Sequence, residues 1–138
     1  MIQAALRLVQ SRVRCEGVSA TILIIDDDPG IREMLGIHLR NAGYQVRSAK
    51  DGIEGGHAIL KSRPDLVITD AQMPHMDGFE LVEALRSDAS IAYIPVIMLT
   101  SEAEWDERGK RLGVNGYVTK PVRADRLLAI VAQHLKHA

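Results

Sequence analysis

Five short apolar segments rich in β-branched residues alternate with five amphipathic segments, and this alternation constrains the fold more than any other feature of the sequence. Strands that alternate with helices are typical of βα units, in which helices cover both faces of a mostly parallel sheet. The chain has 138 residues, enough for one domain with a full core and too few for two. We therefore predict one α/β domain with five strands and five helices.

The apolar segments differ in pattern, and the pattern predicts their place in the sheet. Residues 22–25, 66–69 and 96–99 are continuously apolar or nearly so, as expected of parallel strands covered by helices on both faces. Residues 44–48 alternate apolar with polar side chains, and the segment 117–119 is short. We place the first three in the middle of the sheet and the last two at its edges.

Helices are predicted where apolar residues recur at a spacing of three or four. Asp28 is expected to cap the first of them rather than to bind a metal, with Pro29 at the first helical position. The first predicted helix runs from Pro29 to Gly43, and a second, weaker helix covers 51–63 and is ended by Pro64. The third is capped by Asp77, and the fourth covers 102–112. The fifth carries a core stripe of Leu127, Leu128, Val131 and Leu135.

Polar residues follow four of the predicted strands at their carboxyl ends. These residues are Asp26 and Asp27, Asp70, Thr100 and Lys120. In a right-handed doubly wound sheet all these ends share one edge. With a flavodoxin-like strand order 2-1-3-4-5, the chain direction reverses between the first and third strands, so the three carboxylates would line the crevice at that switch point.

Three carboxylates in one crevice repel one another, because a pair of like charges 4 Å apart already costs about 4 kcal/mol at an effective dielectric near 20. A cation must therefore be present, and oxygen ligands favour Mg²⁺ or Mn²⁺ over Zn²⁺. Lys120 adds an ammonium and Thr100 a hydroxyl donor, which together suit a phosphoryl group. Asp70 lies centrally among them and is the candidate nucleophile, forming an aspartyl phosphate.

Charge and cysteine content exclude several other classes of function. A formal net charge of −1 and a pI of about 6.5 provide no bulk attraction to nucleic acid or to anionic lipid. The single cysteine, Cys15, excludes an intramolecular disulfide and fits a reducing compartment. Apolar runs are far shorter than the roughly 20 residues of a membrane span, and Arg7 interrupts the N-terminal apolar stretch. We expect a soluble cytoplasmic protein with no direct nucleic-acid contact and no membrane insertion.

Four segments together resemble the receiver domain of two-component response regulators, in particular its single-domain chemotaxis and phosphorelay members. They are ILIIDDDPGIREML (22–35), PDLVITDAQMPHMDGFELVEALR (64–86), IPVIMLTSEA (94–103) and GYVTKPV (116–122). The resemblance runs from about Thr21 to the end of the chain. It implies a domain over residues 20–138 that is phosphorylated by a histidine kinase or a phosphotransfer protein and acts on a downstream protein that the sequence does not name.

The resemblance also implies a role for each residue of the site. Asp70 would be the phosphoacceptor, and Asp27, Asp70 and the backbone carbonyl of Gln72 would bind Mg²⁺ directly, with Asp26 acting mainly through water. Lys120 would pair with Asp70 before reaction and with the phosphoryl group afterwards. Thr100 would donate a hydrogen bond to a phosphoryl oxygen. The peptide bond between Lys120 and Pro121 is cis in the family.

A conformational switch is implied as well. Phosphorylation would draw Thr100 inward and turn Tyr117 from an exposed to a buried position, which repacks the fourth helix, fifth strand and fifth helix, the face that partners bind. The modification biases an existing two-state equilibrium by bonding better to one state. An ordinary edge-strand aromatic is the competing interpretation of Tyr117.

The chain departs from the family pattern at several positions. Gly55 and Gly56 stand where receivers usually carry an Ala-Leu pair, and each glycine costs roughly 1 kcal/mol against alanine in a helix interior. We therefore expect the second helix to be short or mobile. Gln72 and Glu102 occupy positions that tune the lifetime of the phosphoryl group in the family.

Two other functions compete with a stand-alone phosphorylated receiver, which is expected because no output domain follows the last predicted helix. One is a phosphatase or phosphotransferase with an aspartyl intermediate, but the haloacid-dehalogenase type needs an acid two residues after its nucleophile, where this chain has Gln72. The other is a receiver-like binding module that is not regulated by phosphorylation. The intact set of site residues argues against it.

Residues 1–19 lie outside the strand and helix alternation and are interpreted as an N-terminal extension. Ile2, Leu6, Val9 and Val13 would lie on one face of a short helix, with Arg7, Arg12 and Arg14 off that face. A partner-binding helix, a disordered tail and a start codon assigned too early all fit this pattern.

Overall fold

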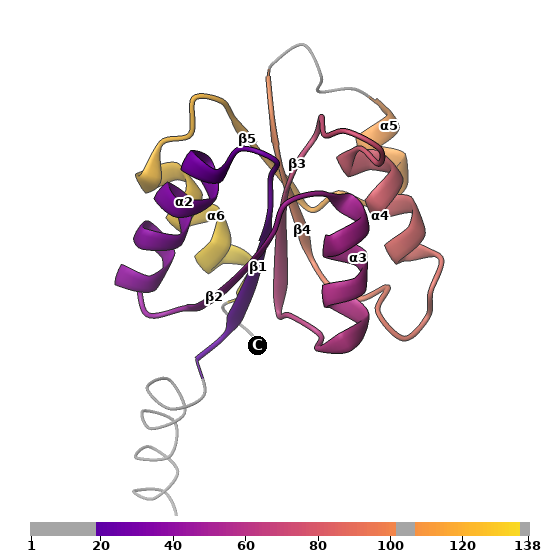
Figure 1. Ribbon diagram of the computed structural model, residues 1–138, viewed down its shortest axis with the longest axis horizontal. Coiled ribbons are helices and arrows are strands. Elements are labelled where there is room, and N and C mark those ends of the chain that lie inside the picture. The colour runs from indigo at the N-terminus through magenta and orange to yellow at the C-terminus, as the bar shows by residue number, and fades with distance from the viewer. Residues whose placement is uncertain (1–18, 102–106, 136–138) are drawn as a thin grey trace, which may run out of the picture.

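Five parallel strands form one sheet in the order β2-β1-β3-β4-β5 (Figure 1). The structure is a computed structural model that describes residues 19–101 and 107–135. The strands are β1 (Thr21–Ile25), β2 (Gln45–Ala49), β3 (Leu66–Asp70), β4 (Val96–Thr100) and β5 (Gly116–Thr119). Their order confirms the predicted doubly wound, flavodoxin-like sheet, in which the chain direction reverses between β1 and β3.

The burial of the strands follows their sequence patterns. Every residue of β3 and β4 is buried, and so are the last four residues of β1, because helices cover both faces of these central strands. The edge strands β2 and β5 each bury only one residue. The predicted division into three central and two edge strands is confirmed.

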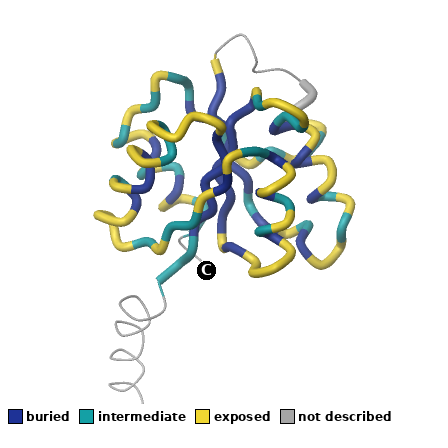
Figure 2. Tube along the Cα trace, in the orientation of Figure 1, coloured by how far each residue is buried: buried dark blue, intermediate teal, exposed yellow. Residues whose placement is uncertain are grey.

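Helices cover the two faces of the sheet unequally (Figures 1 and 2). On one face, α2 (Pro29–Asn41) and α6 (Ala124–Leu135) pack over a core that includes Leu39, Leu66 and Leu127. On the other face, α3 (Gly52–Lys61), α4 (Gly78–Arg86) and α5 (Glu107–Leu112) pack over a core that includes Ile59, Val82 and Met98. The layers hold the carboxyl ends of all five strands at one edge.

Aspartates begin three of the helices. Asp28 accepts hydrogen bonds from the backbone N–H groups of Gly30 and Ile31, as predicted for a cap of α2. Asp51 caps α3, and Asp77 caps α4 in a capping box with Glu80. These carboxylates are thereby engaged in local structure and lie outside the metal centre described below.

The C-terminal boundary of α3 differs from the predicted one. The helix predicted over 51–63 ends at Lys61, with Ser62 already extended, because Pro64 disfavours helical backbone at the residue before it. The helix predicted over 102–112 is described only from Glu107, since residues 102–106, with Glu102, lie outside the described part of the chain. In α6 the predicted stripe is fully buried only at Leu127 and Val131, while Leu128 and Leu135 are half-buried.

Residues 1–18, which include Cys15 and most of the predicted extension, also lie outside the described residues. Within the described ranges, every helix is too short or too polar to cross a membrane.

Two neighbouring glycines in α3 have different surroundings. Gly55 is buried against β1, and a Cβ there would overlap the Cδ1 of Ile25. Gly56 has no heavy atom within 4 Å of the position that a Cβ would take. α3 has ten residues, against nine in α4, so it is not unusually short among these helices. Gly55 is needed because α3 approaches the sheet closely.

Substituting these glycines by alanine should therefore have opposite effects. Gly56→Ala is expected to raise the free energy of unfolding by about 0.5 to 1 kcal/mol, because alanine restricts the unfolded chain and favours the helix. Gly55→Ala should lower it by about 1 kcal/mol, since overpacking outweighs the same gain. Urea unfolding of both variants tests the pair, and a shift of the same sign in both would contradict this account.

Candidate metal centre

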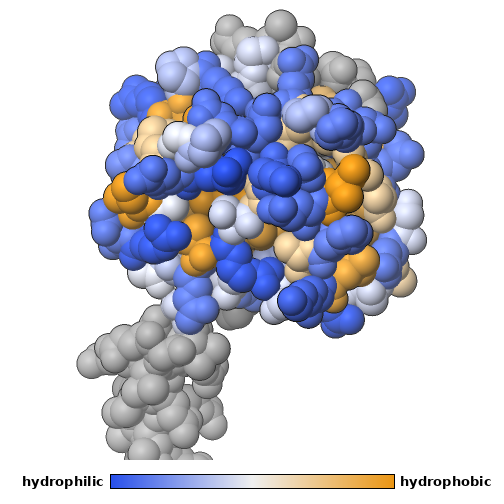
Figure 3. All heavy atoms as spheres, in the orientation of Figure 1, coloured by the Kyte–Doolittle hydropathy of each residue, from blue (hydrophilic) through white to orange (hydrophobic). Residues whose placement is uncertain are grey.

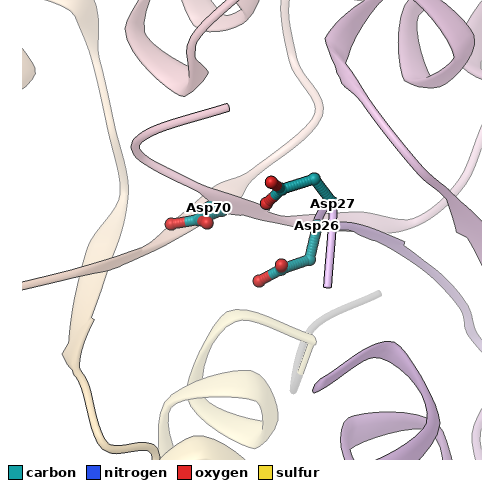
Figure 4. Close-up of side chains that lie close together, drawn as sticks. All are labelled: Asp26, Asp27 and Asp70. Atoms are coloured by element: carbon teal, nitrogen blue, oxygen red, sulfur yellow. The ribbon is translucent and has the colours of Figure 1, made fainter. Parts of the chain in front are cut away.

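Three carboxylates meet at the carboxyl edge of the sheet, at the switch point between β1 and β3 (Figure 4). Asp26 and Asp27 follow directly after β1, and Asp70 is the last residue of β3. Each offers an oxygen atom within 4.8 Å of an oxygen of the other two. The parallel pairing of β1 with β3 brings residues 43 or more positions apart in sequence into this one crevice.

Lys120 completes the site from the end of β5. Its Nζ lies 2.9 Å from Oδ1 of Asp70 and 3.8 Å from Oδ2 of Asp26. Its backbone N–H donates to the carbonyl oxygen of Thr100 over 2.9 Å, which fixes the start of the Lys120 segment to the end of β4. The peptide bond from Lys120 to Pro121 is cis, as the family resemblance implied.

The ammonium of Lys120 stays charged in this setting. Burial by itself lowers the pKa of Lys120, but the hydrogen bond and charge of Asp70, together with the charges of Asp26 and Asp27, outweigh it. The pKa is therefore raised above its ordinary value. Lys120 is a permanent positive charge beside Asp70, which is the form needed to hold a carboxylate or a phosphoryl oxygen.

Asp26 is the most enclosed carboxylate of the three, with none of its surface exposed. Its Oδ1 accepts a hydrogen bond from the backbone N–H of Asp28 over 2.9 Å, whereas its buried Oδ2 has no hydrogen bond among the described residues. Burial raises the pKa of Asp26 to about 6, opposed by the Asp28 hydrogen bond and reinforced by the charge of Asp70. Without a cation, ionising the Asp26 carboxyl in the folded protein therefore costs free energy.

These observations fit a hard divalent cation. An all-oxygen donor set suits Mg²⁺ or Mn²⁺, and a buried carboxylate oxygen without a hydrogen bond is a polar atom that a cation or its water would satisfy. Asp27 is exposed, so the centre opens to solvent on one side. The acidic triad is typical of the magnesium site of receiver domains.

The shifted pKa of Asp26 predicts how the stability of the metal-free protein depends on pH. Because the folded state binds this proton more tightly than the unfolded state, the contribution is full below pH 3.8 and is lost as the pH rises through about 6. A shift of this size corresponds to at most about 3 kcal/mol. Asp26→Asn should therefore stabilise the metal-free protein increasingly over wild type between about pH 4.5 and 7.

Urea unfolding in EDTA at several pH values measures this difference, and Asp125→Asn, at an exposed carboxylate on α6, is the control. Saturating Mg²⁺ should stabilise wild type more than the Asp26→Asn variant. A constant difference between Asp26→Asn and wild type across the pH range would disprove the assignment.

Thr100, Tyr117 and Gln72 lie around the acidic cluster. Thr100 is buried at the end of β4, next to β5, and its hydroxyl donates to the carbonyl oxygen of Ser101 over 3.0 Å. Tyr117 is half-buried in β5 and packs against the core under α3, α4 and α5. Gln72 lies two residues after Asp70, and its backbone N–H points to Oδ1 of Asp70 over 3.4 Å.

Two residues that support the site were not singled out from the sequence. Arg32 on α2 donates to the backbone carbonyl oxygen of Asp26 over 2.6 Å. Gly78, at the start of α4, lies so close to β3 that a Cβ there would overlap the carbonyl oxygen of Asp70. The sequence around Asp77 predicts only the helix cap there, and not the close approach of Gly78 to β3.

Comparison with known proteins agrees with this geometry. The response regulator receiver domain family matches residues 22–132. The DNA-binding dual master transcriptional regulator RpaA of Synechocystis sp. is 41% identical over 117 residues, which are 83% of this chain and 48% of RpaA. The hybrid signal transduction histidine kinase D of Dictyostelium discoideum is 39% identical over 112 residues, 80% of this chain and 7% of the kinase.

Solved structures match over most of both chains. A response regulator from Chloroflexus aurantiacus superimposes with a TM-score of 0.81 and 36% identity, covering 86% of this chain and 98% of its own. The chemotaxis response regulator CheY4 of Vibrio cholerae gives a TM-score of 0.79 and 38% identity, covering 83% and 98%. The chain spans about half the length of the regulators RpaA, GltR and PhoB that it matches.

A receiver domain is a phosphoacceptor signalling module rather than a conventional enzyme, and it takes its phosphoryl group from histidine kinases. The strand order, the acidic triad at the switch point and the match over residues 22–132 point the same way. This chain belongs to the response regulator receiver domain family.

Proposed function

We propose that Asp70 is the phosphoacceptor of this domain and receives its phosphoryl group from a histidine kinase or a phosphotransfer protein. The observation that carries the proposal is the 2.9 Å contact between the Lys120 ammonium and Asp70, in a crevice that also holds Asp26 and Asp27. An ammonium and a divalent-cation site on either side of one carboxylate suit transfer of a dianionic group to that carboxylate.

The transfer step needs few protein groups. An oxygen of Asp70 attacks phosphorus, a new O–P bond forms, and the N–P bond of the donor phosphohistidine breaks, with the imidazole leaving with the electron pair. Lys120 neutralises charge on the phosphoryl oxygens. Asp27, Asp70 and the backbone carbonyl of Gln72 would hold Mg²⁺ directly, with Asp26 acting through water. The ion, when bound, lowers the repulsion between Asp70 and the incoming group.

We propose that phosphorylation switches the face formed by α5, β5 and α6, where a partner protein binds. Thr100 lies opposite Thr119 in the β4–β5 pairing, so a shift of its hydroxyl toward a phosphoryl oxygen would act directly on β5. Tyr117 is two residues before Thr119 on the same strand. A change in the position of the Tyr117 ring would transmit the shift to the partner face. Signal output then follows from protein contact or from onward transfer of the phosphoryl group.

Incubation with a small acyl phosphate tests the assignment. We expect Mg²⁺-dependent incorporation of one phosphoryl group into the wild-type protein, detected by intact mass or by a mobility shift. Asp70→Asn should abolish incorporation, because the amide oxygen is a poor nucleophile. Asp125→Asn is the matched control on an exposed carboxylate and should label like wild type.

Labelling that survives Asp70→Asn would defeat the assignment of the phosphoacceptor. Complete absence of labelling in wild type, both with acyl phosphate and with phosphorylated kinases, would favour the alternative of a binding module that phosphorylation does not regulate. Multiple turnover on a phosphorylated metabolite would instead favour an independent phosphatase.

A further inference from the structure

An apolar groove runs between α3 and α4, on the face of the sheet away from α2. It is a hollow of about 240 Å³ with Ile59, Leu81 and Leu85 among its lining residues. Ile53 and Leu60 also line it and are 48% and 61% exposed, so large apolar side chains reach solvent there. Figure 3 shows apolar residues gathered over this region. We call this hollow the α3–α4 groove.

The groove exists partly because α3 lacks a side chain at Gly56, which lines it and has open space where a Cβ would be. One end is formed by Gly52, Ile53 and Met76, close to the loop that follows Asp70, and the other by Leu60 and Asp88. A groove that is open along the length of α3 can accept an apolar helix face.

The chain enters the domain beside the Leu60 end of this groove. The backbone N–H of Thr21 donates to Asp65 Oδ2 over 2.7 Å, and the N–H of Asp65 donates to the carbonyl oxygen of Thr21 over 2.8 Å. Asp65 lies four residues after the last residue of α3, Lys61. Thr21, near the start of the described chain at Ser19, therefore lies next to the segment that follows α3.

The sequence of that segment matches the groove in length, apolarity and charge. Ile2, Leu6, Val9 and Val13 recur at spacings of four, three and four, which gives one apolar helix face. A helix over residues 2–13 would be about 18 Å long, against about 15 Å for the ten residues of α3. Residues 1–18 hold three arginines and one glutamate, so the segment carries a net positive charge. The groove carries acidic groups: Asp88 lines it, and Glu80 is exposed one turn before the groove residue Ala84.

We propose that residues 2–13 occupy the α3–α4 groove of their own chain as an amphipathic helix. Val13 then lies near Leu60, and Ile2 near Ile53, because the chain enters at the Leu60 end. The short tether through Gly17 to Thr21 keeps the segment at a high local concentration, so a modest apolar contact suffices to hold it. The basic side chains off the apolar face lie toward Glu80 and Asp88.

Paramagnetic labelling of the full chain tests both the docking and its direction. Cys15 is the only cysteine and takes one nitroxide without further changes. A second sample carries the nitroxide at position 3, in a Gln3→Cys, Cys15→Ser variant. The label at Cys15 should weaken the amide signals of Leu60 and Asp88 most, and the label at position 3 those of Ile53 and Met76. Reduction of the nitroxide should restore all four.

Substitutions in the groove supply the control. Leu60→Glu should remove the effect of the position 3 label on Ile53 and Met76, because it places a carboxylate in the apolar contact; Ile53→Glu is the alternative variant if the first unfolds. Ile37→Glu, at a 47% exposed residue on α2, should leave the effect unchanged.

No selective weakening of Ile53 and Met76 by the position 3 label would overturn the proposal, and so would weakening that survives Leu60→Glu. A mixture of nitroxide-labelled, unenriched chain with unlabelled, ¹⁵N-enriched chain distinguishes docking within one chain from docking into a second copy. Weakening of groove signals in that mixture would mean that the segment docks into a second copy, which contradicts docking within one chain.

Discussion

Replacing Arg86 with alanine is expected to lower the free energy of unfolding by about 3 to 4 kcal/mol, which would reduce the melting temperature by about 10 °C. The Arg86 guanidinium, at the end of α4, uses all its N–H groups within the protein. It donates to the backbone carbonyl oxygens of Ala92, Ile94 and Gly113 and to the side-chain oxygen of Asn115.

The size of this effect follows from where the acceptors lie. The bonds to Ala92 and Ile94 are partly buried, so their loss leaves carbonyl groups without a donor in a region with little water. The Asn115 side chain also accepts a hydrogen bond from the backbone N–H of Val96, the first residue of β4. Arg86 therefore orients a side chain that holds the start of β4. Arg86 thereby ties α4, the segment before β4 and the segment before β5 together.

Arg86→Lys should recover less than half of the lost stability, because an ammonium lacks the planar fork that reaches several acceptors at once. Arg126→Ala, at an exposed arginine on α6, should change stability by no more than about 0.5 kcal/mol. Urea unfolding followed by far-UV circular dichroism gives all three values. A loss below about 1 kcal/mol for Arg86→Ala would show that water replaces these bonds readily.

Gly78→Ala is the second substitution with a large expected effect, and it joins stability to phosphorylation. The added Cβ would overlap the carbonyl oxygen of Asp70 and lie 3.1 Å from the Cε of Met98. The backbone at the end of β3 cannot move aside as easily as a side-chain tip, so either α4 or Asp70 must shift. We expect a loss of about 3 kcal/mol, at the upper end of what overpacking costs.

The same shift should slow the labelling of Asp70, because it would change the position of the carboxylate relative to the Lys120 ammonium. Labelling rates with acyl phosphate are compared at a temperature where the variant remains folded. Gly56→Ala is the matched control, a glycine-to-alanine change in a helix with open space, and should label like wild type. A Gly78→Ala variant with wild-type stability and labelling would show that α4 adjusts without disturbing Asp70.

Much of the site was accessible from the sequence because a parallel sheet converts sequence position into spatial position. Once the apolar runs ending before Asp26 and at Thr69 are assigned to neighbouring parallel strands, the carboxylates that follow them must meet at one edge. The strands were the easiest elements to predict, since burial on both faces leaves a continuous apolar run. Caps were equally clear, because Asp28 and Asp77 act on backbone groups only a few residues away.

Contacts between distant segments were not accessible in this way. The sequence marks Gly55 only as a weak point of its helix, whereas the close approach of α3 to Ile25 requires it. Arg86 carried no pattern at all, because its acceptors are backbone carbonyls that any residue would supply. The chemistry of Asp26 also depends on enclosure, since its pKa of about 6 arises first from burial.

The sequence by itself determined the class of fold and the set of chemical groups at the carboxyl edge, because periodicity and strand ends are local properties of the chain. The strand order is not local, and it was expected from the flavodoxin-like fold rather than from periodicity. Tertiary structure alone decided how close those groups come and what holds them there. The 2.9 Å contact of Lys120 with Asp70, the unsatisfied Oδ2 of Asp26 and the tight packing at Gly78 depend on how helices settle on the sheet. That packing sums many weak contacts between distant residues, and no short stretch of sequence records it.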